Sequence, residues 1–174
     1  MRVIAGTLKG RRLEGPAKHE LDVRPTSDRA REALFSILQR WPDGAFVDLF
    51  GGTGAVALEA HSRGFGPVTC VEADPQAFLF KNMKLGGVGL VRRNVEKLGP
   101  GAFRNVSVVF ADPPYEKSAG LWTRVAPMLR PWLKEDGVLA WETDERAELV
   151  PLDAWRLVEA RRYGTARFHF FEGR

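Results

Sequence analysis

The stretch between Ala45 and Ala60 constrains the fold of this chain most. An apolar run, Ala45-Phe46-Val47-Asp48-Leu49-Phe50, leads into Gly51-Gly52-Thr53-Gly54 and then into Ala55-Val56-Ala57-Leu58-Glu59-Ala60, a good helix former. A strand, a glycine turn and a helix in this order open a nucleotide-binding βα unit. Its glycines let a ligand approach the backbone, and the helix N-terminus offers free N–H groups. The sequence therefore predicts a ligand site at this turn.

A second acid supports a ribose-bearing ligand. The run Val68-Thr69-Cys70-Val71 ends in Glu72, at about the spacing of 20 residues at which such an acid grips the hydroxyls of a ribose. Read as Gly52-x-Gly54-x-x-Ala57, the loop also fits the dinucleotide fingerprint. The glycines alone therefore do not name the cofactor.

Asp48 bears on that choice, because it lies inside the first strand, just before the glycines. A carboxylate there suits a cofactor with an ammonium group, such as S-adenosylmethionine, and would repel a pyrophosphate. The alternative is an Asp that caps the glycine turn through its backbone N–H groups. Asp48 alone leaves the two interpretations about even.

Asp112-Pro113-Pro114-Tyr115 decides in favour of the methyl donor. It follows the apolar run Val106–Ala111, which has the character of a buried strand. The carboxylate and a proline carbonyl can accept the two hydrogens of an exocyclic amino group, and the ring can stack on the base that carries it. Without the rest of the chain, the motif would also fit a strand end followed by a polyproline-like turn.

These motifs resemble those of a known family. Val47–Gly54, Glu72 and Asp112–Tyr115 are similar to the first, second and fourth motifs of S-adenosylmethionine-dependent amino-group methyltransferases. Three N-terminal segments resemble a narrower family, the bacterial 16S ribosomal RNA guanine-N2 methyltransferases that modify guanine 966. The segments are Arg2-Val3-Ile4-Ala5-Gly6, Lys9-Gly10-Arg11-Arg12-Leu13 and Arg24-Pro25-Thr26-Ser27-Asp28-Arg29-Ala30-Arg31-Glu32-Ala33-Leu34-Phe35.

The resemblance implies a substrate and a set of site residues. The substrate is 16S ribosomal RNA, within the small ribosomal subunit or an assembly intermediate. The expected catalytic residues are Asp112, Pro113, Pro114 and Tyr115. The expected cofactor-binding residues are Asp48, Phe50, Gly51, Gly52, Thr53, Gly54, Glu72 and Asn94, although Asn94 fits a plain turn residue equally well.

Alternating strand and helix signals predict the fold class, a Rossmann-like α/β methyltransferase fold with a mostly parallel seven-stranded sheet. Strands are expected at 45–50, 67–73, 88–92, 106–111 and 137–143, with an antiparallel edge hairpin from 155–161 and 166–171. Helices are expected at 54–64, 75–85 and 119–130, with a helical turn near Val95. The N-terminus should add a small hairpin, Val3–Ala5 with Arg11–Leu13, and a helix from a Thr26 or Ser27 cap to about Arg40.

Charge is concentrated at the N-terminus. Up to Arg31 the chain has eight Lys and Arg against four Asp and Glu, an excess equal to the net charge of +4 for the whole protein. We therefore expect residues 1–25 to form a basic arm for RNA and residues 26–174 to form the methyltransferase domain. The candidate RNA contacts are Arg2, Lys9, Arg11, Arg12, Arg24 and Arg29. The alternative is that these basic side chains are only solvated surface residues. For Arg29 and Arg31 the two possibilities are a solvated side chain and a contact with phosphate or cofactor.

Composition sets the remaining limits. With 174 residues and 44% hydrophobic content, the chain fits one globular domain. It has no signal-peptide pattern, no long apolar run for a membrane and no Cys/His spacing for a metal. Cys70 lies in an expected buried strand, so a core role is favoured over a reactive thiol. We expect a cytoplasmic monomer.

Three other functions stay open. A DNA adenine-N6 methyltransferase uses a similar clamp, but it needs a target-recognition domain that a chain this short lacks. A dinucleotide-dependent oxidoreductase would leave Asp112–Tyr115 and the basic arm without a role. A non-catalytic RNA-binding module would not need the cofactor residues, which are all present.

Overall fold

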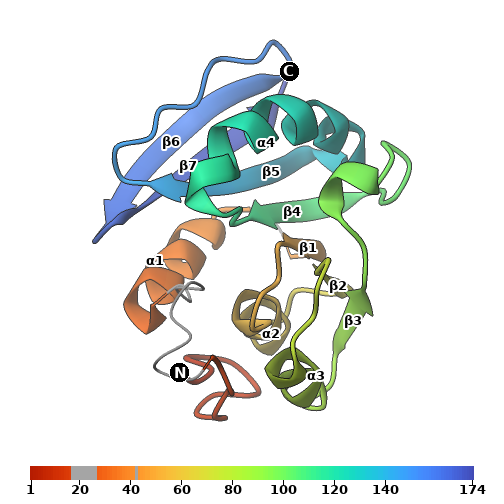
Figure 1. The fold of residues 1–174 in the computed structure, drawn as a ribbon, viewed down its shortest axis with the longest axis vertical. Coiled ribbons are helices and arrows are strands. Elements are labelled where there is room, and N and C mark those ends of the chain that lie inside the picture. Colours follow the sequence, from red (N-terminus) through yellow and green to blue (C-terminus); the bar gives the residue numbers. More distant parts are fainter. Residues whose placement is uncertain (17–26, 42) are drawn as a thin grey trace.

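A computed structural model of the protein describes residues 1–16, 27–41 and 43–174. In these residues seven strands form one sheet in the order β3-β2-β1-β4-β5-β7-β6 (Figure 1). The strands are β1 (Ala45–Leu49), β2 (Val68–Val71), β3 (Val88–Val91), β4 (Val106–Ala111), β5 (Leu133–Asp144), β6 (Trp155–Tyr163) and β7 (Ala166–Gly173). The first five pair in parallel, whereas β7 is antiparallel to both β5 and β6. This topology confirms the predicted fold class.

Helices cover both faces of the sheet (Figure 1). They are α1 (Asp28–Leu38), α2 (Ala55–Ser62), α3 (Ala77–Met83) and α4 (Tyr115–Leu129), with short 3-10 turns η1 (Val95–Lys97) and η2 (Arg130–Trp132). Alternate residues of β1 separate the two cores. Phe46 packs with the apolar residues of α1 and α2, whereas Val47 and Leu49 pack with those of α4. Strand periodicity therefore makes a three-layer sandwich.

Helix α4 begins four residues earlier than the expected 119, at Tyr115. Pro114 is its N-cap residue, with φ −50°. A proline fixes φ near this value and lacks the N–H that a helix start would leave unpaired, so the helix can begin directly after it. As a result, Tyr115 is placed in the first turn of a helix rather than in a loop.

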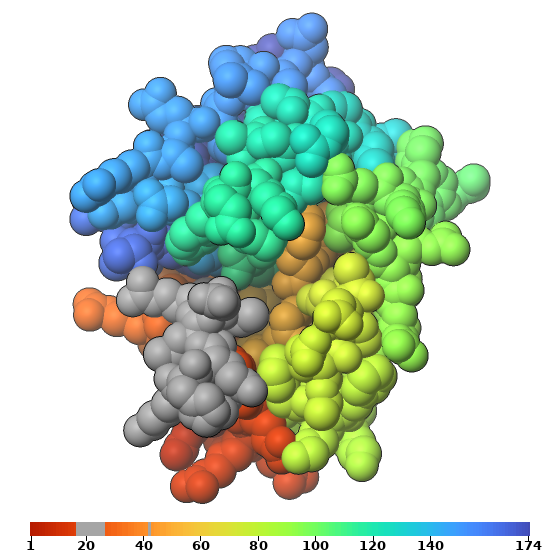
Figure 2. Space-filling view, in the orientation of Figure 1, coloured from red at the N-terminus to blue at the C-terminus, as the bar shows by residue number. Residues whose placement is uncertain are grey.

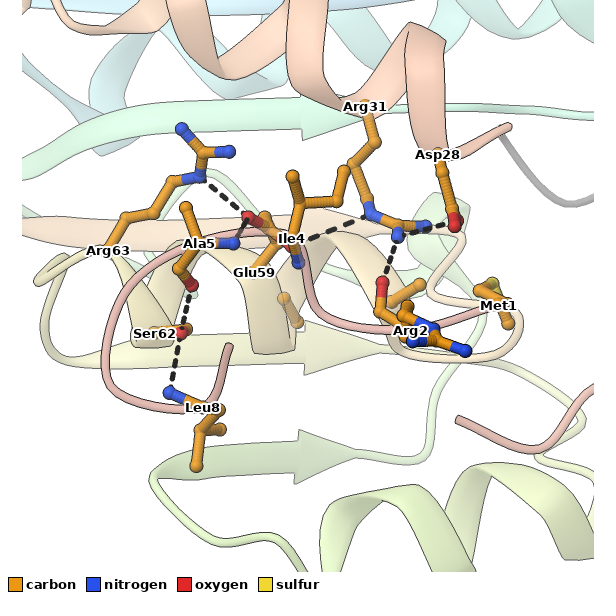
Figure 3. Close-up of polar contacts among 12 residues, drawn as sticks. Met1, Arg2, Ile4, Ala5, Leu8, Asp28, Arg31, Glu59, Ser62 and Arg63 are labelled. Atoms are coloured by element: carbon orange, nitrogen blue, oxygen red, sulfur yellow. Dashed lines mark hydrogen bonds and ion pairs between the residues drawn. The ribbon is translucent and has the colours of Figure 1, made fainter. Parts of the chain in front are cut away.

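The expected N-terminal hairpin is wrong in its extent, because Arg2 and Arg12 form a single antiparallel bridge instead of two strands. The buried carboxylate of Glu59 on α2 accepts the N–H groups of Ile4 and Ala5 at 2.8 and 3.0 Å (Figure 3). The hydroxyl of Ser62 accepts the Leu8 N–H at 2.8 Å. These backbone groups are bonded to α2, so a strand ladder cannot use them.

The expectation for Arg31 is also wrong. Helical spacing places it off the apolar face of α1, yet its side chain is 0% exposed. Its Nη2 donates to the Arg2 carbonyl at 2.6 Å and to Asp28 at 2.9 Å, and its Nε lies 3.8 Å from Glu59 (Figure 3). Arg31 therefore links the N-terminal segment to both α1 and α2. A buried guanidinium needs carboxylate or carbonyl partners, and these three elements supply them.

Two other local expectations, the Ser27 cap and the buried Cys70, are confirmed. The Ser27 hydroxyl accepts the Ala30 N–H at 3.1 Å as the cap of α1. Cys70 is fully buried, as expected. In the part of the chain that the structure describes, every helix is too short or too polar to cross a membrane.

Candidate active site

The sheet order brings the predicted motifs together. Strand β1 lies between β2 and β4, and all three run in the same direction. The chain leaves β1 towards β2 on one side and returns to β4 on the other, which opens a crevice at their carboxyl ends. The glycine loop follows β1, Glu72 follows β2 and Asp112 follows β4. All three motifs therefore reach one crevice.

The glycine loop is held in a conformation that most residues avoid. Phe50 has φ +63° although it is not a glycine, which costs on the order of 1–2 kcal/mol. A Cβ on Gly51 would lie 2.1 Å from the sulfur of Cys70, so the buried cysteine requires a glycine above it. The surrounding packing thus constrains the backbone of Phe50 and Gly51.

Asp48 is only 2% exposed, and its Oδ2 accepts the Ala57 N–H at 3.1 Å. Burial raises the pKa of the Asp48 carboxyl well above its ordinary value. Repulsion from Asp112 adds to this rise in pKa, and the hydrogen bond from Ala57 opposes it. Asp48 therefore binds the first turn of α2, and it also lines the crevice.

Glu72 spans the loop and the end of β2. Its two carboxylate oxygens accept N–H groups from Gly52 at 2.9 Å and from Asp74 at 3.0 Å. A carboxylate offers about four lone-pair sites, so these two bonds leave acceptor capacity for a ligand's hydroxyl groups. The backbone bonds hold Glu72 at the mouth of the crevice.

The crevice has a volume of about 490 Å³. Its described lining contains five acids and no Lys, Arg or His; the acids are Asp48, Glu72, Asp74, Asp112 and Glu116. Figure 2 shows the residues around β1 recessed between the teal α4 and the yellow-green α3. A concave site with this sign of charge attracts cations and disfavours an anionic pyrophosphate.

Asp112, Pro113, Pro114 and Tyr115 all line this crevice. The Tyr115 hydroxyl donates to Oε1 of Glu142, a buried residue of β5, at 3.1 Å. Burial raises the pKa of Tyr115 above its ordinary value, and the nearby Glu142 charge adds to the rise. The Tyr115 residue is 39% exposed. Its hydroxyl is therefore anchored while part of the ring remains open for stacking.

Two predicted cofactor residues lie elsewhere than in the described lining. Gly54 is the left-handed N-cap residue of α2, with φ +76°. Asn94 caps η1, and its Oδ1 accepts the Glu96 N–H at 2.8 Å. All the other predicted catalytic and cofactor residues line the crevice.

Sequence reasoning missed seven lining residues, which are Ala55, Val56, Phe110, Glu116, Asp74, Gln76 and Phe78. The last three follow β2 closely. The signal that could have found them is their place directly after Glu72, at the carboxyl end of a parallel strand.

The described basic candidates lie on the surface. Arg2, Lys9, Arg11, Arg12 and Arg29 are exposed, and none forms an ion pair with another described residue. Arg2, Lys9 and Arg29 line a second, more open cavity of about 410 Å³, together with Asp28 and Glu32. The sixth candidate, Arg24, lies outside the described residues.

Within the described residues, no three His, Cys, Asp or Glu side chains are grouped so that they could hold a metal ion.

Comparison with known proteins agrees with this architecture. A solved structure of a hypothetical protein from Thermus thermophilus is 31% identical, covers 99% of both chains and superposes with a TM-score of 0.83. Ribosomal RNA small subunit methyltransferase D of Escherichia coli K12 is 30% identical over 99% of this chain and 89% of its own length. YlbH of Bacillus subtilis, named as a candidate rRNA methyltransferase, is 35% identical over 86% of this chain and 85% of its own.

The sheet order, the glycine loop and these relatives define the class: the protein is an enzyme with the Rossmann-like methyltransferase fold. More narrowly, the chain belongs to the family described as "Conserved hypothetical protein 95", which matches residues 1–172.

Proposed function

We propose that the protein transfers a methyl group from S-adenosylmethionine to the exocyclic N2 amino group of a guanine in 16S ribosomal RNA, guanine 966 in the family that the sequence resembles. Membership of a family with small-subunit rRNA methyltransferases supports the substrate class. The observation that carries the proposal is that Asp112–Tyr115 and the acid-rich glycine-loop site share one crevice.

The donor set fits S-adenosylmethionine. This cofactor supplies an electrophilic methyl group on a sulfonium, and it also carries an ammonium group. Asp48 and Asp112 line the crevice, and their carboxylates favour a cationic ligand there. Burial raises the pKa of Asp48, and a bound cation would lower that pKa because it favours the charged form. Glu72 keeps lone pairs for ribose hydroxyls, and the glycine loop admits close backbone approach. A pyrophosphate would meet the same carboxylates unfavourably.

Asp112 and the Pro113 carbonyl are the proposed acceptors for the two hydrogens of the guanine amino group. The lone pair of that nitrogen is delocalised into the purine ring, so it is a weak nucleophile. Two fixed acceptors favour a tetrahedral nitrogen, and the prolines keep the acceptors in place. Tyr115, anchored by Glu142, presents its ring to a guanine drawn out of its stack. No covalent enzyme intermediate is required.

The arm of residues 1–25 is the proposed source of RNA affinity, and residues 26–174 are the proposed methyltransferase domain. Because acids line the active crevice, RNA phosphates need cations elsewhere. The exposed side chains of Arg2, Lys9 and Arg29 surround the second cavity, and Arg11 and Arg12 lie close to it along the chain. Arg24 remains a candidate from sequence alone. The proposed partner is the small ribosomal subunit or an assembly intermediate, bound by a monomer in the cytoplasm.

One experiment tests the reaction. The protein is incubated with tritium-labelled S-adenosylmethionine and, in separate reactions, small ribosomal subunits, naked 16S RNA and DNA. Nucleoside analysis of the product should show N2-methylguanosine from ribosomal RNA. Label in N6-methyladenine of DNA would instead support the DNA methyltransferase alternative.

Calorimetry tests the cofactor. We expect the protein to bind S-adenosylhomocysteine and not NADH, because the crevice is acidic. The reverse result would support the oxidoreductase alternative and overturn the proposal.

A further inference from the structure

Asn82 of α3 joins two parts of the chain that the proposed function keeps separate. Its Oδ1 accepts the Glu14 N–H at 2.8 Å, and its Nδ2 donates to the Glu14 carbonyl at 2.8 Å. The same Nδ2 donates to the Thr53 carbonyl at 2.8 Å. Asn82 is only 3% exposed. Both of its N–H donors are therefore used by backbone carbonyls in a site that excludes water.

Thr53 belongs to the glycine loop and lines the active crevice. The next residue, Gly54, is pressed against α3: a Cβ there would lie 2.4 Å from Met83 Cε and 2.8 Å from Leu79 Cδ1. The far side of the loop thus rests on α3, and the hydrogen bond from Asn82 fixes the direction of the Thr53 carbonyl. Asn82 reaches the cofactor loop without lining the crevice itself.

Glu14 belongs to the N-terminal segment, two residues beyond the exposed Arg12. This segment lies beside α3 at one end of the molecule (Figure 1). Lys81, the neighbour of Asn82, also contacts it through an ion pair with the Glu14 carboxylate at 2.8 Å, but both of those side chains are more than half exposed. The buried link to this segment therefore runs through the Asn82 amide, because an exposed pair contributes little.

We propose that Asn82 is a positioning residue that couples cofactor binding to RNA binding. The inference rests on the proposed function, because it takes the glycine loop as the cofactor site and the N-terminal segment as an RNA contact. A ligand that orders the Thr53 carbonyl also orders Asn82, and Asn82 then holds Glu14 and the basic residues before it. Coupling of this kind is reciprocal, so RNA should tighten cofactor binding by the same factor.

The first test is cofactor affinity. Asn82→Ala removes all three hydrogen bonds and leaves the Thr53 carbonyl in a buried place without this donor. We expect the Kd of S-adenosylhomocysteine to rise on the order of tenfold. The KM for S-adenosylmethionine should rise with it, while kcat changes less than about threefold, because Asn82 contacts no reacting group. Lys81→Ala is the matched control on the same helix. It breaks the exposed pair with Glu14 and leaves Thr53 untouched, so its Kd should match that of the wild type.

The second test is the coupling itself. The Kd for 16S RNA is measured with and without saturating S-adenosylhomocysteine at one salt concentration. The ratio of the two values should be several-fold in the wild type and in Lys81→Ala, and close to one in Asn82→Ala. An undiminished ratio in Asn82→Ala, or a ratio of one in the wild type, overturns the inference and leaves the proposed function standing. Failure of the wild type to bind S-adenosylhomocysteine overturns both.

If Asn82→Ala does not fold, hydrogen exchange of the wild-type protein tests the coupling instead. The Glu14 amide donates to Asn82, so S-adenosylhomocysteine should slow its exchange. Unchanged Glu14 exchange at saturating ligand overturns the coupling.

Discussion

The substitution Glu59→Gln tests how the N-terminal segment is attached. The Glu59 carboxylate is 0% exposed, and it accepts the N–H groups of Ile4 and Ala5 and the Arg63 Nε–H, the last at 2.7 Å. It also faces the buried Arg31 at 3.8 Å. Gln retains one acceptor oxygen and turns an NH₂ group towards existing donors. Among the described residues, it also leaves the Arg31 charge with only the Asp28 carboxylate as an ionic partner.

The expected loss follows from these contacts. Removal of one partner of a buried ion pair costs about 3–5 kcal/mol, and a hydrogen bond to a charged group contributes about 1.5–3 kcal/mol. We expect the free energy of unfolding to fall by about 3–5 kcal/mol. For a domain of this size each kcal/mol corresponds to roughly 2–4 °C, so Tm should fall by about 6–20 °C.

Urea unfolding followed by circular dichroism measures this loss, and hydrogen exchange at Ile4 and Ala5 reports local release of the segment. If the N-terminal segment detaches while the rest stays folded, both amides should exchange fast and the free energy of global unfolding should fall by less than expected. Glu96→Gln is the control, because the Glu96–Arg124 pair is exposed and should contribute less than about 1 kcal/mol. A loss below about 1 kcal/mol in Glu59→Gln, with both amides still protected, would refute the reasoning.

Three further predictions concern catalysis, RNA binding and pH. Asp112→Ala should lower kcat by at least about a hundredfold while the Kd of S-adenosylhomocysteine stays within a few-fold; near-normal turnover would mean that the motif is only a strand end. Replacing Lys9, Arg11 and Arg12 with Ala should flatten the log–log salt dependence of RNA binding by about two units or more, and an unaltered slope would make the arm solvated surface. Burial and the nearby Arg167 charge lower the pKa of His169 to about 4, so stability should fall as the pH drops from about 6.5, where an unfolded histidine gains its proton, towards 4. Urea unfolding of His169→Gln at several pH values should show about 2 kcal/mol less of this loss, and an identical pH dependence would contradict the assignment.

Periodicity and motif order were sufficient for the sheet. The strand after Gly44, the glycine turn and the strand before Asp112 were all predicted. The buried strands of a parallel sheet have continuous apolar sequences, so they can be recognised directly. The crevice followed from the same argument, since carboxyl ends of parallel strands meet at one edge. Nearly every predicted cofactor and catalytic residue lines it.

The errors concern polar residues whose partners lie far away in the chain. Arg31 looked solvent-facing because helix periodicity separates apolar from charged positions, yet Glu59 and the Arg2 carbonyl meet it in the interior. The N-terminal hairpin is shorter than expected for the same reason, because the Glu59 side chain accepts the N–H groups of Ile4 and Ala5. Asn82 carries no local pattern, since both backbone segments that it binds are distant in sequence.

The attachment of the N-terminal segment sets an order for folding during synthesis. Ile4 and the Glu59 side chain that binds its N–H are 55 positions apart. At about 5–20 residues per second, the segment therefore waits roughly 3–11 s for its partner to be made. Through that interval Ile4 and Ala5 have no α2 to bind, and Arg31 has its Asp28 partner but not yet the Glu59 carboxylate. Residues made early are thus among the last to be fixed in place, after β1 and the glycine loop have been translated.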